Sequence, residues 1–225
     1  MVVGAASRIE LAALGAQLPS CLTIGQLEQQ LGVVVITLPT PMQDDLVSLV
    51  QRVDARQQLG ELLSRYGMAV DDRDFDTLGQ LFAPDGEFHG VVGRAQIVDY
   101  YRARTATFTT SSHYALTWHF DFESDVLARG VVNAHAELCI GGKTVRLALR
   151  YLDRYVKQEG RWMFLVRHLK FRYVLAFDEV AHGLDDPMRV RWPGSPAQRA
   201  DLPESLPTYL DSRRAQGPPA VPPNT

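Results

Sequence analysis

The feature that most constrains the fold is a change of hydrophobic period near residue 110. Before this point apolar residues recur every three or four positions, which is typical of helices. After it they alternate every second position in four long runs, which predicts strands over residues 112–122, 128–140, 144–158 and 162–177. Short glycine turns join the later runs, so consecutive strands pair as antiparallel hairpins. Helices followed by such a sheet predict an α+β fold and not alternating βαβ units.

The helical half contains three predicted helices. The first covers residues 46–70, where one apolar stripe is formed by Leu46, Leu49, Val50, Val53, Leu59, Leu62, Leu63, Tyr66 and Val70. Asp74 is placed to cap a short second helix. A turn at 83–86, a strand over 87–92 and a third helix over 93–104 complete this half.

The two ends differ from the middle, which suggests three regions. Residues 1–44 form an N-terminal extension, in which a short helix capped by Thr23 and a strand over 32–41 are predicted. Residues 45–177 form the main domain. Residues 178–225 are a tail rich in proline and charge, whose first part is expected to pack on the domain through Trp192, Leu202 and Tyr209. The last ten or so residues have a composition typical of disorder.

Composition excludes several classes of function. The net charge of the 225 residues is −3, and no basic stripe is present, so we expect no nucleic-acid partner. No apolar run reaches the roughly 18 residues of a membrane span, so no membrane partner is expected. Cys21 and Cys139 lie far apart and support neither a disulfide framework nor a zinc site. The N-terminus lacks the pattern of an export signal, and we expect a cytoplasmic protein.

The stretch SSHYALTWHFDF, residues 111–122, alternates unusually. One parity carries large apolar side chains, namely Tyr114, Leu116, Trp118, Phe120 and Phe122. The other parity carries His113, Ala115, Thr117, His119 and Asp121. A half-buried strand normally turns its polar row to water. The same row could instead line a polar pocket, and the pattern alone does not choose between the two.

Three segments in order give a resemblance to a known family. The segment LLSRYGMAVDDRDFDTLGQLFAPDGEFHG, then TSSHYALTWHF, and then YLDRYVKQEGRWMF resemble SnoaL-like proteins of the nuclear transport factor 2-like superfamily, over about residues 46–175. The resemblance implies a cone-shaped, curved antiparallel sheet packed against N-terminal helices around a pocket, often in dimers or trimers. That superfamily includes scytalone dehydratase, hexachlorocyclohexane dehydrochlorinase, polyketide cyclases, ketosteroid isomerase and non-catalytic subunits, so fold alone does not give the function.

The resemblance places two catalytic residues, Asp71 and His113. From spacing alone, Asp71 could be a helix-terminal carboxylate and His113 a solvated residue at a strand end. Both, however, match positions at which the dehydratase and dehydrochlorinase branch carries its catalytic histidine and pocket aspartate. Histidine exchanges protons near neutral pH, and a carboxylate on one ring nitrogen leaves the other free to take a substrate proton. Such a dyad needs neither cofactor nor metal.

Further residues are candidates for binding the substrate: Tyr66, His89, Thr117, His119, Asn133 and His135. Each has a plainer interpretation as a core tyrosine or a surface polar group. If His113, Thr117 and His119 share the pocket face, Tyr114, Leu116, Trp118 and Phe120 form an outer face. An exposed apolar row needs a cover, so we expect a homodimer or homotrimer built on it. A β-bulge near His113 would shift this assignment.

The function predicted from these residues is a cofactor-independent lyase of the dehydratase type. Its substrate would be a small, mostly apolar molecule, of a cyclic, polyketide-like or steroid-like kind. An isomerase or cyclase using the same dyad is one alternative. A ligand-binding or oligomerising subunit, such as the β-subunit of a ring-hydroxylating dioxygenase, is another.

Overall fold

The computed structural model describes residues 40–216. The chain divides into two compact units, residues 1–49 and 50–225, and of the first only residues 40–49 are described. The predicted helix at Thr23, nearly all of the predicted strand over 32–41, and the last nine residues lie outside the described part. Everything below concerns the second unit unless stated otherwise.

The helices largely follow the predicted periodicity. Helix α2 spans Thr40–Asp71, α3 spans Phe75–Gln80, α4 spans Arg94–Thr105 and α5 spans Pro207–Gln216, with a 3₁₀ turn η1 at Phe177–Glu179. Asp74 caps α3 as predicted, because its Oδ1 accepts a hydrogen bond from the Thr77 backbone N–H at 2.9 Å. No helix within residues 40–216 is long and apolar enough to cross a membrane.

Only the second part of the predicted stripe on α2 is buried. Leu59, Leu62, Leu63, Tyr66 and Val70 belong to the core. Val50 and Val53 are exposed, so the burial predicted for them is wrong. Periodicity identifies a helix face correctly, but it does not say how far along the helix the sheet extends to cover that face.

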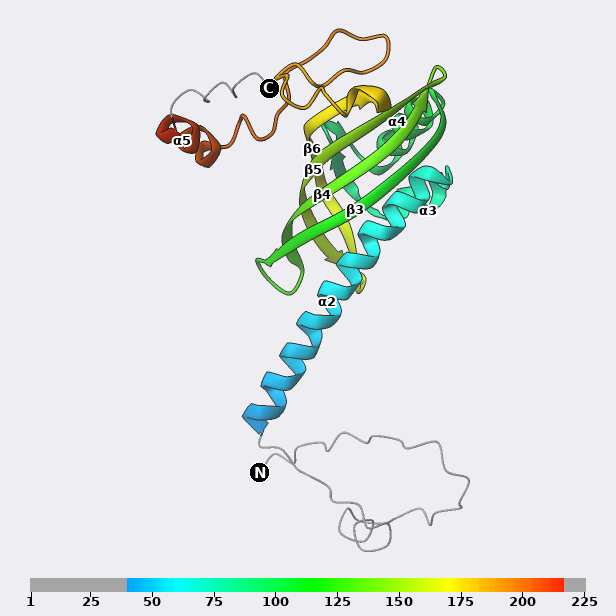
Figure 1. Ribbon diagram of the computed structural model, residues 1–225. Helices are drawn as coiled ribbons and strands as arrows, with labels where there is room; N and C mark the ends of the chain where they lie inside the picture. The colour runs from blue at the N-terminus through cyan, green and yellow to red at the C-terminus, as the bar shows by residue number, and fades with distance from the viewer. Residues whose placement is uncertain (1–39, 217–225) are drawn as a thin grey trace, which may run out of the picture. The chain divides into compact units, whose positions relative to one another are not determined.

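A six-stranded sheet, in the order β2-β1-β6-β5-β4-β3, forms the other layer. The four long strands are β3 (Phe108–Phe122), β4 (Leu127–Ile140), β5 (Lys143–Gln158) and β6 (Arg161–Ala176), which lie side by side in Figure 1. Each pairs antiparallel with the next. The α+β class is therefore confirmed.

The short strands β1 (Phe82–Phe88) and β2 (Val91–Val92) depart from the prediction. Strand β1 pairs with β6 in parallel, so the sheet is not purely antiparallel. Residues 83–86, predicted as a turn, lie inside β1 as an irregularity of the pairing. The strand predicted over 87–92 is broken, because His89 (φ 48°) and Gly90 (φ 93°) turn the chain before β2 begins.

A β-bulge in β3 determines which side chains face the helices. Ala115 lies opposite Ala134 and Thr117 lies opposite Asn133, so Leu116 is an extra residue and the alternation reverses beyond it. Phe120 is consequently only 1% exposed, against Tyr155. Trp118 faces the helix side as well, near Gly60 of α2. The prediction that Trp118 and Phe120 share an outer row with Tyr114 is wrong for this reason.

The core contains a charged pair. Arg167 of β6 is 1% exposed, and its guanidinium donates hydrogen bonds of 3.0 and 2.8 Å to Asp153 of β5. The rings of Tyr66, Tyr151 and Phe164 surround the guanidinium carbon at about 4 Å. Burial alone would lower the pKa of Arg167, but the Asp153 carboxylate more than offsets it. The pair is thus satisfied by charge, hydrogen bonds and ring faces.

The segment after β6 packs back on the domain. The buried Arg189 guanidinium pairs with Glu204 and also donates to the backbone carbonyls of Arg172 and Leu202. Val190 forms bridges to Val174 and Gln198. The chain reverses over residues 192–195, with Pro193 followed by Gly194 at φ 76°, as a type II turn requires. This reversal holds Trp192 against Phe171 of β6.

Candidate active site

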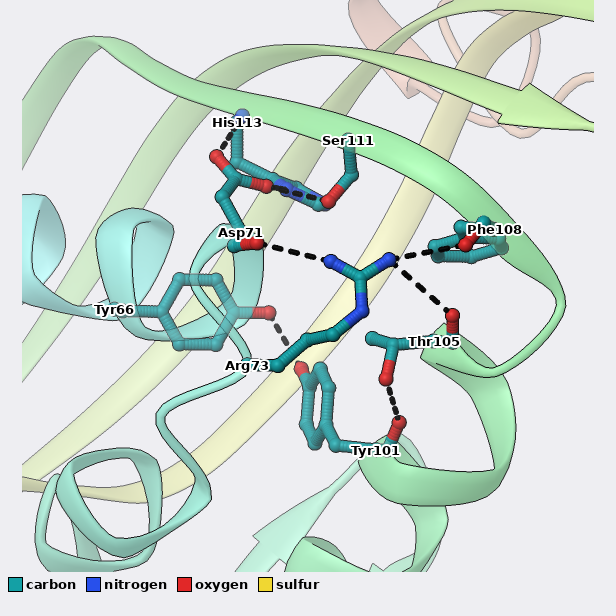
Figure 2. Close-up of polar contacts among 8 residues, drawn as sticks. All are labelled: Tyr66, Asp71, Arg73, Tyr101, Thr105, Phe108, Ser111 and His113. Atoms are coloured by element: carbon teal, nitrogen blue, oxygen red, sulfur yellow. Dashed lines mark hydrogen bonds and ion pairs between the residues drawn. The ribbon is translucent and has the colours of Figure 1, made fainter.

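Asp71 and His113 are in direct contact. The Asp71 Oδ1 and His113 Nδ1 atoms are 2.6 Å apart, and Asp71 Oδ2 accepts the His113 backbone N–H at 2.7 Å. The Ser111 hydroxyl donates to Asp71 Oδ1 at 2.8 Å. Figure 2 shows the carboxylate between these two residues of β3. Because the end of α2 supplies the acid and the start of β3 supplies the imidazole, 42 residues of chain separate the two.

A close approach of helix and strand brings the pair together. A Cβ atom at Gly67 of α2 would lie 3.1 Å from the His113 carbonyl oxygen, so any larger residue would crowd the strand. Beyond the helix, Arg73 (φ 57°) donates to the carbonyls of Asp71 and Phe108, each at 3.0 Å (Figure 2). These contacts fix the end of α2 to the start of β3, and therefore fix the carboxylate relative to the imidazole.

The electrostatics favour an ionised Asp71. Partial burial would raise the pKa of this carboxyl, but hydrogen bonds and charge from His113, with the Ser111 hydroxyl, outweigh it and hold the pKa below its ordinary value. An ionised carboxylate only accepts hydrogen bonds, so Nδ1 of His113 carries the proton. In the neutral imidazole Nε2 is then a free base. No other hydrogen bond of this ring is found within residues 40–216.

His113 lines a cavity of about 500 Å³ between the helices and the sheet. Most of its wall is apolar or aromatic, from Val70, Phe88, Tyr100, Phe108, Leu138, Leu147, Leu149, Leu169, Phe171 and Trp192. The polar wall consists of His113, Tyr66, Tyr101, Tyr151, His89, Arg104, Thr105 and Gln198. A mostly apolar chamber with a few convergent polar groups is typical of a site for a small organic ligand.

Two phenol groups meet at this wall. The hydroxyl oxygens of Tyr66 and Tyr101 are 2.5 Å apart (Figure 2). Burial raises the pKa of Tyr66, although the nearby Arg167 charge acts against it, and burial raises the pKa of Tyr101 well above its ordinary value. Both hydroxyls therefore keep their protons at neutral pH; one donates to the other, and the remaining proton is available for a ligand oxygen.

The other predicted residues divide between two places. Tyr66 and His89 line the cavity with His113. Thr117, His119, Asn133 and His135 lie on the opposite face of the sheet, because of the bulge at Leu116 and the register with β4. There Asn133 donates to Thr117 at 3.0 Å and Arg150 donates to Asn133 at 3.1 Å. His119 contacts Asp121, and His135 contacts Arg146. None of these four residues lines the cavity of about 500 Å³; His135 shares with His113 only a hollow of about 10 Å³.

Several cavity residues were missed from the sequence. One of them contacts Asp71, namely Ser111, and four line the cavity, namely Tyr101, Tyr151, Arg104 and Thr105. Each lies in a pattern that is typical of an ordinary helix or strand. Ser111 shares the parity of His113, which could have drawn attention to it. Within residues 40–216, no group of three or more His, Cys, Asp or Glu side chains is arranged to hold a metal ion.

Comparison with known proteins identifies the same family as the motifs. The SnoaL-like domain family matches residues 51–179. Solved structures of similar fold include a candidate scytalone dehydratase from Novosphingobium aromaticivorans (20% identity, TM-score 0.54, covering 57% of this chain and 91% of that one). LinA is 22% identical, with a TM-score of 0.56, over 58% of this chain and 94% of its own.

A third structure is the type 3 hexachlorocyclohexane dehydrochlorinase from Novosphingobium barchaimii (19% identity, TM-score 0.54, covering 57% of this chain and 93% of that one). At these identities the likeness shows a shared fold. No curated protein matches this chain in sequence.

Proposed function

Because the chain belongs to the SnoaL-like family, we propose that it is a cofactor-independent lyase of the dehydratase type. The substrate is a small, mostly apolar molecule with an acidified C–H bond and a leaving group on the next carbon. The observation that carries this proposal is the 2.6 Å contact between Asp71 and His113 at the wall of an apolar cavity.

In the proposed reaction, Nε2 of His113 takes the proton from the carbon next to a carbonyl. The C–H electron pair forms the new double bond, and hydroxide or another anion leaves from the β-carbon. For loss of water, the imidazolium returns its proton to the departing hydroxide. Asp71 keeps the imidazole in the required tautomer and stabilises the imidazolium, as the carboxylate of a His–Asp pair does elsewhere.

The two phenols have a role in the same scheme. Charge develops on the substrate carbonyl oxygen as its α-proton leaves, and a hydrogen-bond donor directed at that oxygen lowers the barrier. Tyr66 and Tyr101 line the cavity with His113, and their raised pKa values keep them protonated. We assign one of these hydroxyls to the carbonyl oxygen.

The comparisons support this class of reaction. Two of the structurally similar proteins are described as a scytalone dehydratase and a hexachlorocyclohexane dehydrochlorinase, both of which are eliminating enzymes by name. The shared fold does not determine which side chains line the cavity, so the substrates of these two proteins are not proposed for this one.

The test uses a panel of β-hydroxy ketones with the wild type, His113→Ala and Asp71→Asn. Each substitution should lower turnover by about 10²–10⁴-fold, the usual contribution of a positioned general base, while circular dichroism at the assay temperature still shows the wild-type fold. Equal rates in wild type and variants would end the proposal.

The same assay in D₂O separates elimination from isomerisation. A lyase forms the unsaturated ketone. An isomerase or cyclase using the same base exchanges the α-proton for deuterium and forms no free water or halide. Product analysis by NMR therefore identifies which reaction follows the proton transfer.

A further inference from the structure

The charge balance of the cavity wall is one-sided. Its lining residues include Arg104, His89 and His113 but no aspartate or glutamate. Asp71 lies behind His113 and does not line the cavity. At the Arg104 wall a guanidinium faces the cavity with no carboxylate opposite it in the lining, and low-dielectric walls strengthen the field of such a charge. Such a chamber favours a ligand that carries negative charge.

Arg104 is the fixed positive charge in this wall. It lies in the last turn of α4 and is half-buried. Its guanidinium carbon is 5.1 Å from the centre of the Phe108 ring and 4.7 Å from the centre of the Trp192 ring. No side-chain hydrogen bond or ion pair of Arg104 is found within residues 40–216. Ring faces hold the guanidinium in place but leave its N–H groups available, because stacking uses the plane and not the edge.

The plainer role of Arg104 is a cation that complements the C-terminal end of a helix. Arg102 of the same turn fits that role: it is exposed, stacks on Phe75 at 4.7 Å and does not line the cavity. Arg104 differs in its place on the cavity wall and in the clamp formed by Trp192. That clamp exists because Arg189 and the turn at 192–195 bind the C-terminal segment to the domain.

We infer that Arg104 is a specificity-determining residue that binds a carboxylate of the substrate inside the cavity. The substrate of the proposed lyase is then an apolar, ring-containing acid, with its carboxylate at Arg104 and its reacting carbon at His113. This inference rests on the proposed function only in taking the cavity as the substrate site. A bidentate Arg–carboxylate contact would fix the orientation of an otherwise apolar molecule.

The experiment compares two probes of nearly equal shape, 1-naphthaleneacetate and its uncharged amide, 1-naphthaleneacetamide. Binding is measured by calorimetry or by quenching of tryptophan fluorescence with the full chain. The wild type should bind the acid about ten- to a hundred-fold more tightly than the amide, the range expected for a charge-assisted contact. Arg104→Gln should abolish this preference while changing amide affinity by less than about two-fold.

Matched variants control the result. Arg102→Gln should keep the preference, because that guanidinium lies outside the cavity, and Arg104→Lys should keep part of it. His113→Asn should also keep it; loss of the preference there would assign the anion to His113 and overturn the inference. Equal affinity of the wild type for both probes, or no saturable binding of the acid, would overturn it as well.

The elimination assay is independent of this measurement. A preference for the acid that depends on Arg104, together with unchanged turnover in His113→Ala, would support the carboxylate site and contradict the proposed lyase activity. Reduced turnover in His113→Ala without a preference that depends on Arg104 would support the lyase activity and contradict the carboxylate site.

Discussion

Strand β3 carries two histidines, His113 and His119, that each contact an aspartate, and the two pairs differ in their surroundings. His113 contacts Asp71 at 2.6 Å, with side chains 17% and 20% exposed. His119 contacts Asp121 at 3.0 Å, with side chains 69% and 73% exposed. The first pair combines strand and helix and lines a cavity. The second pair lies within one strand, on the opposite face of the sheet.

Proximity is common to the two pairs, and burial and fixed orientation are what separate them. Water screens an exposed ion pair and competes for its hydrogen bonds, so the aspartate hardly orients the ring. Around Asp71, the Ser111 hydroxyl and the His113 backbone N–H occupy the other carboxylate positions. That carboxylate has a single orientation, and the imidazole bonded to it has one free nitrogen facing an apolar chamber.

The largest expected effect follows directly from this contrast. His113→Ala and Asp71→Asn should lower turnover by about 10²–10⁴-fold, whereas His119→Ala and Asp121→Asn should leave it within about two-fold, because their pair has no access to the cavity. Initial rates under identical conditions measure both sets. A comparable loss from His119→Ala would remove the distinction between the two faces.

The next largest effect concerns the buried pair Asp153–Arg167. Asp153→Asn leaves the Arg167 guanidinium buried without its carboxylate, which costs about 3–5 kcal/mol of unfolding free energy. Urea denaturation followed by circular dichroism measures this difference. Asp121→Asn, a substitution of the same kind on the open face, serves as the control. A loss below about 1 kcal/mol for Asp153→Asn would show that water reaches the core pair.

A third effect is expected on assembly. The outer face of the sheet exposes Tyr114, Leu116, Val131 and Leu152. Beside Leu152 it is hollowed, and the lining of the hollow carries charges of both signs, from Glu87, Asp121, Arg129 and Arg154. A surface that carries both positive and negative charges can complement a second copy of itself about a two-fold axis. We therefore expect a homodimer through this face.

Leu152→Glu should shift that dimer toward monomer in sedimentation velocity, because it buries a charge at the centre of the contact. Leu210→Glu, at an exposed apolar position of α5, should not. A wild type that sediments as a monomer at all concentrations tested would contradict the expected assembly.

The smallest effect concerns pH. The folded-state pKa of Asp71 is depressed, so its interactions stabilise the fold above the unfolded pKa and are lost as the pH falls through the folded value. The difference in unfolding free energy between wild type and Asp71→Asn should thus be constant near neutral pH and shrink below about pH 4. Ser111→Ala, which removes one hydrogen bond to the carboxylate, should move this decline to higher pH. A difference independent of pH would show that Asp71 is not ionised in the fold.

Much of this architecture was predictable from local pattern. The period change near residue 110 predicts helices before strands, and glycine turns predict the hairpins, because these signals depend on a few neighbouring residues. The motifs around Asp71 and His113 indicated the family. The same local signals misplaced residues 83–86 and the burial of Val50 and Val53, where the outcome depends on how far a distant element extends.

The sequence by itself determined the order of the main elements and the family, and it indicated Asp71 and His113 as a candidate pair. The tertiary structure alone decided which side chains meet. One extra residue at Leu116 reverses the faces of β3, turning His119 to solvent and Phe120 into the core, and a period of two cannot reveal an insertion that depends on pairing with β4. The stacking of Arg104 on Trp192 likewise joins segments almost ninety residues apart. Such contacts arise from packing, and packing is set by the whole chain.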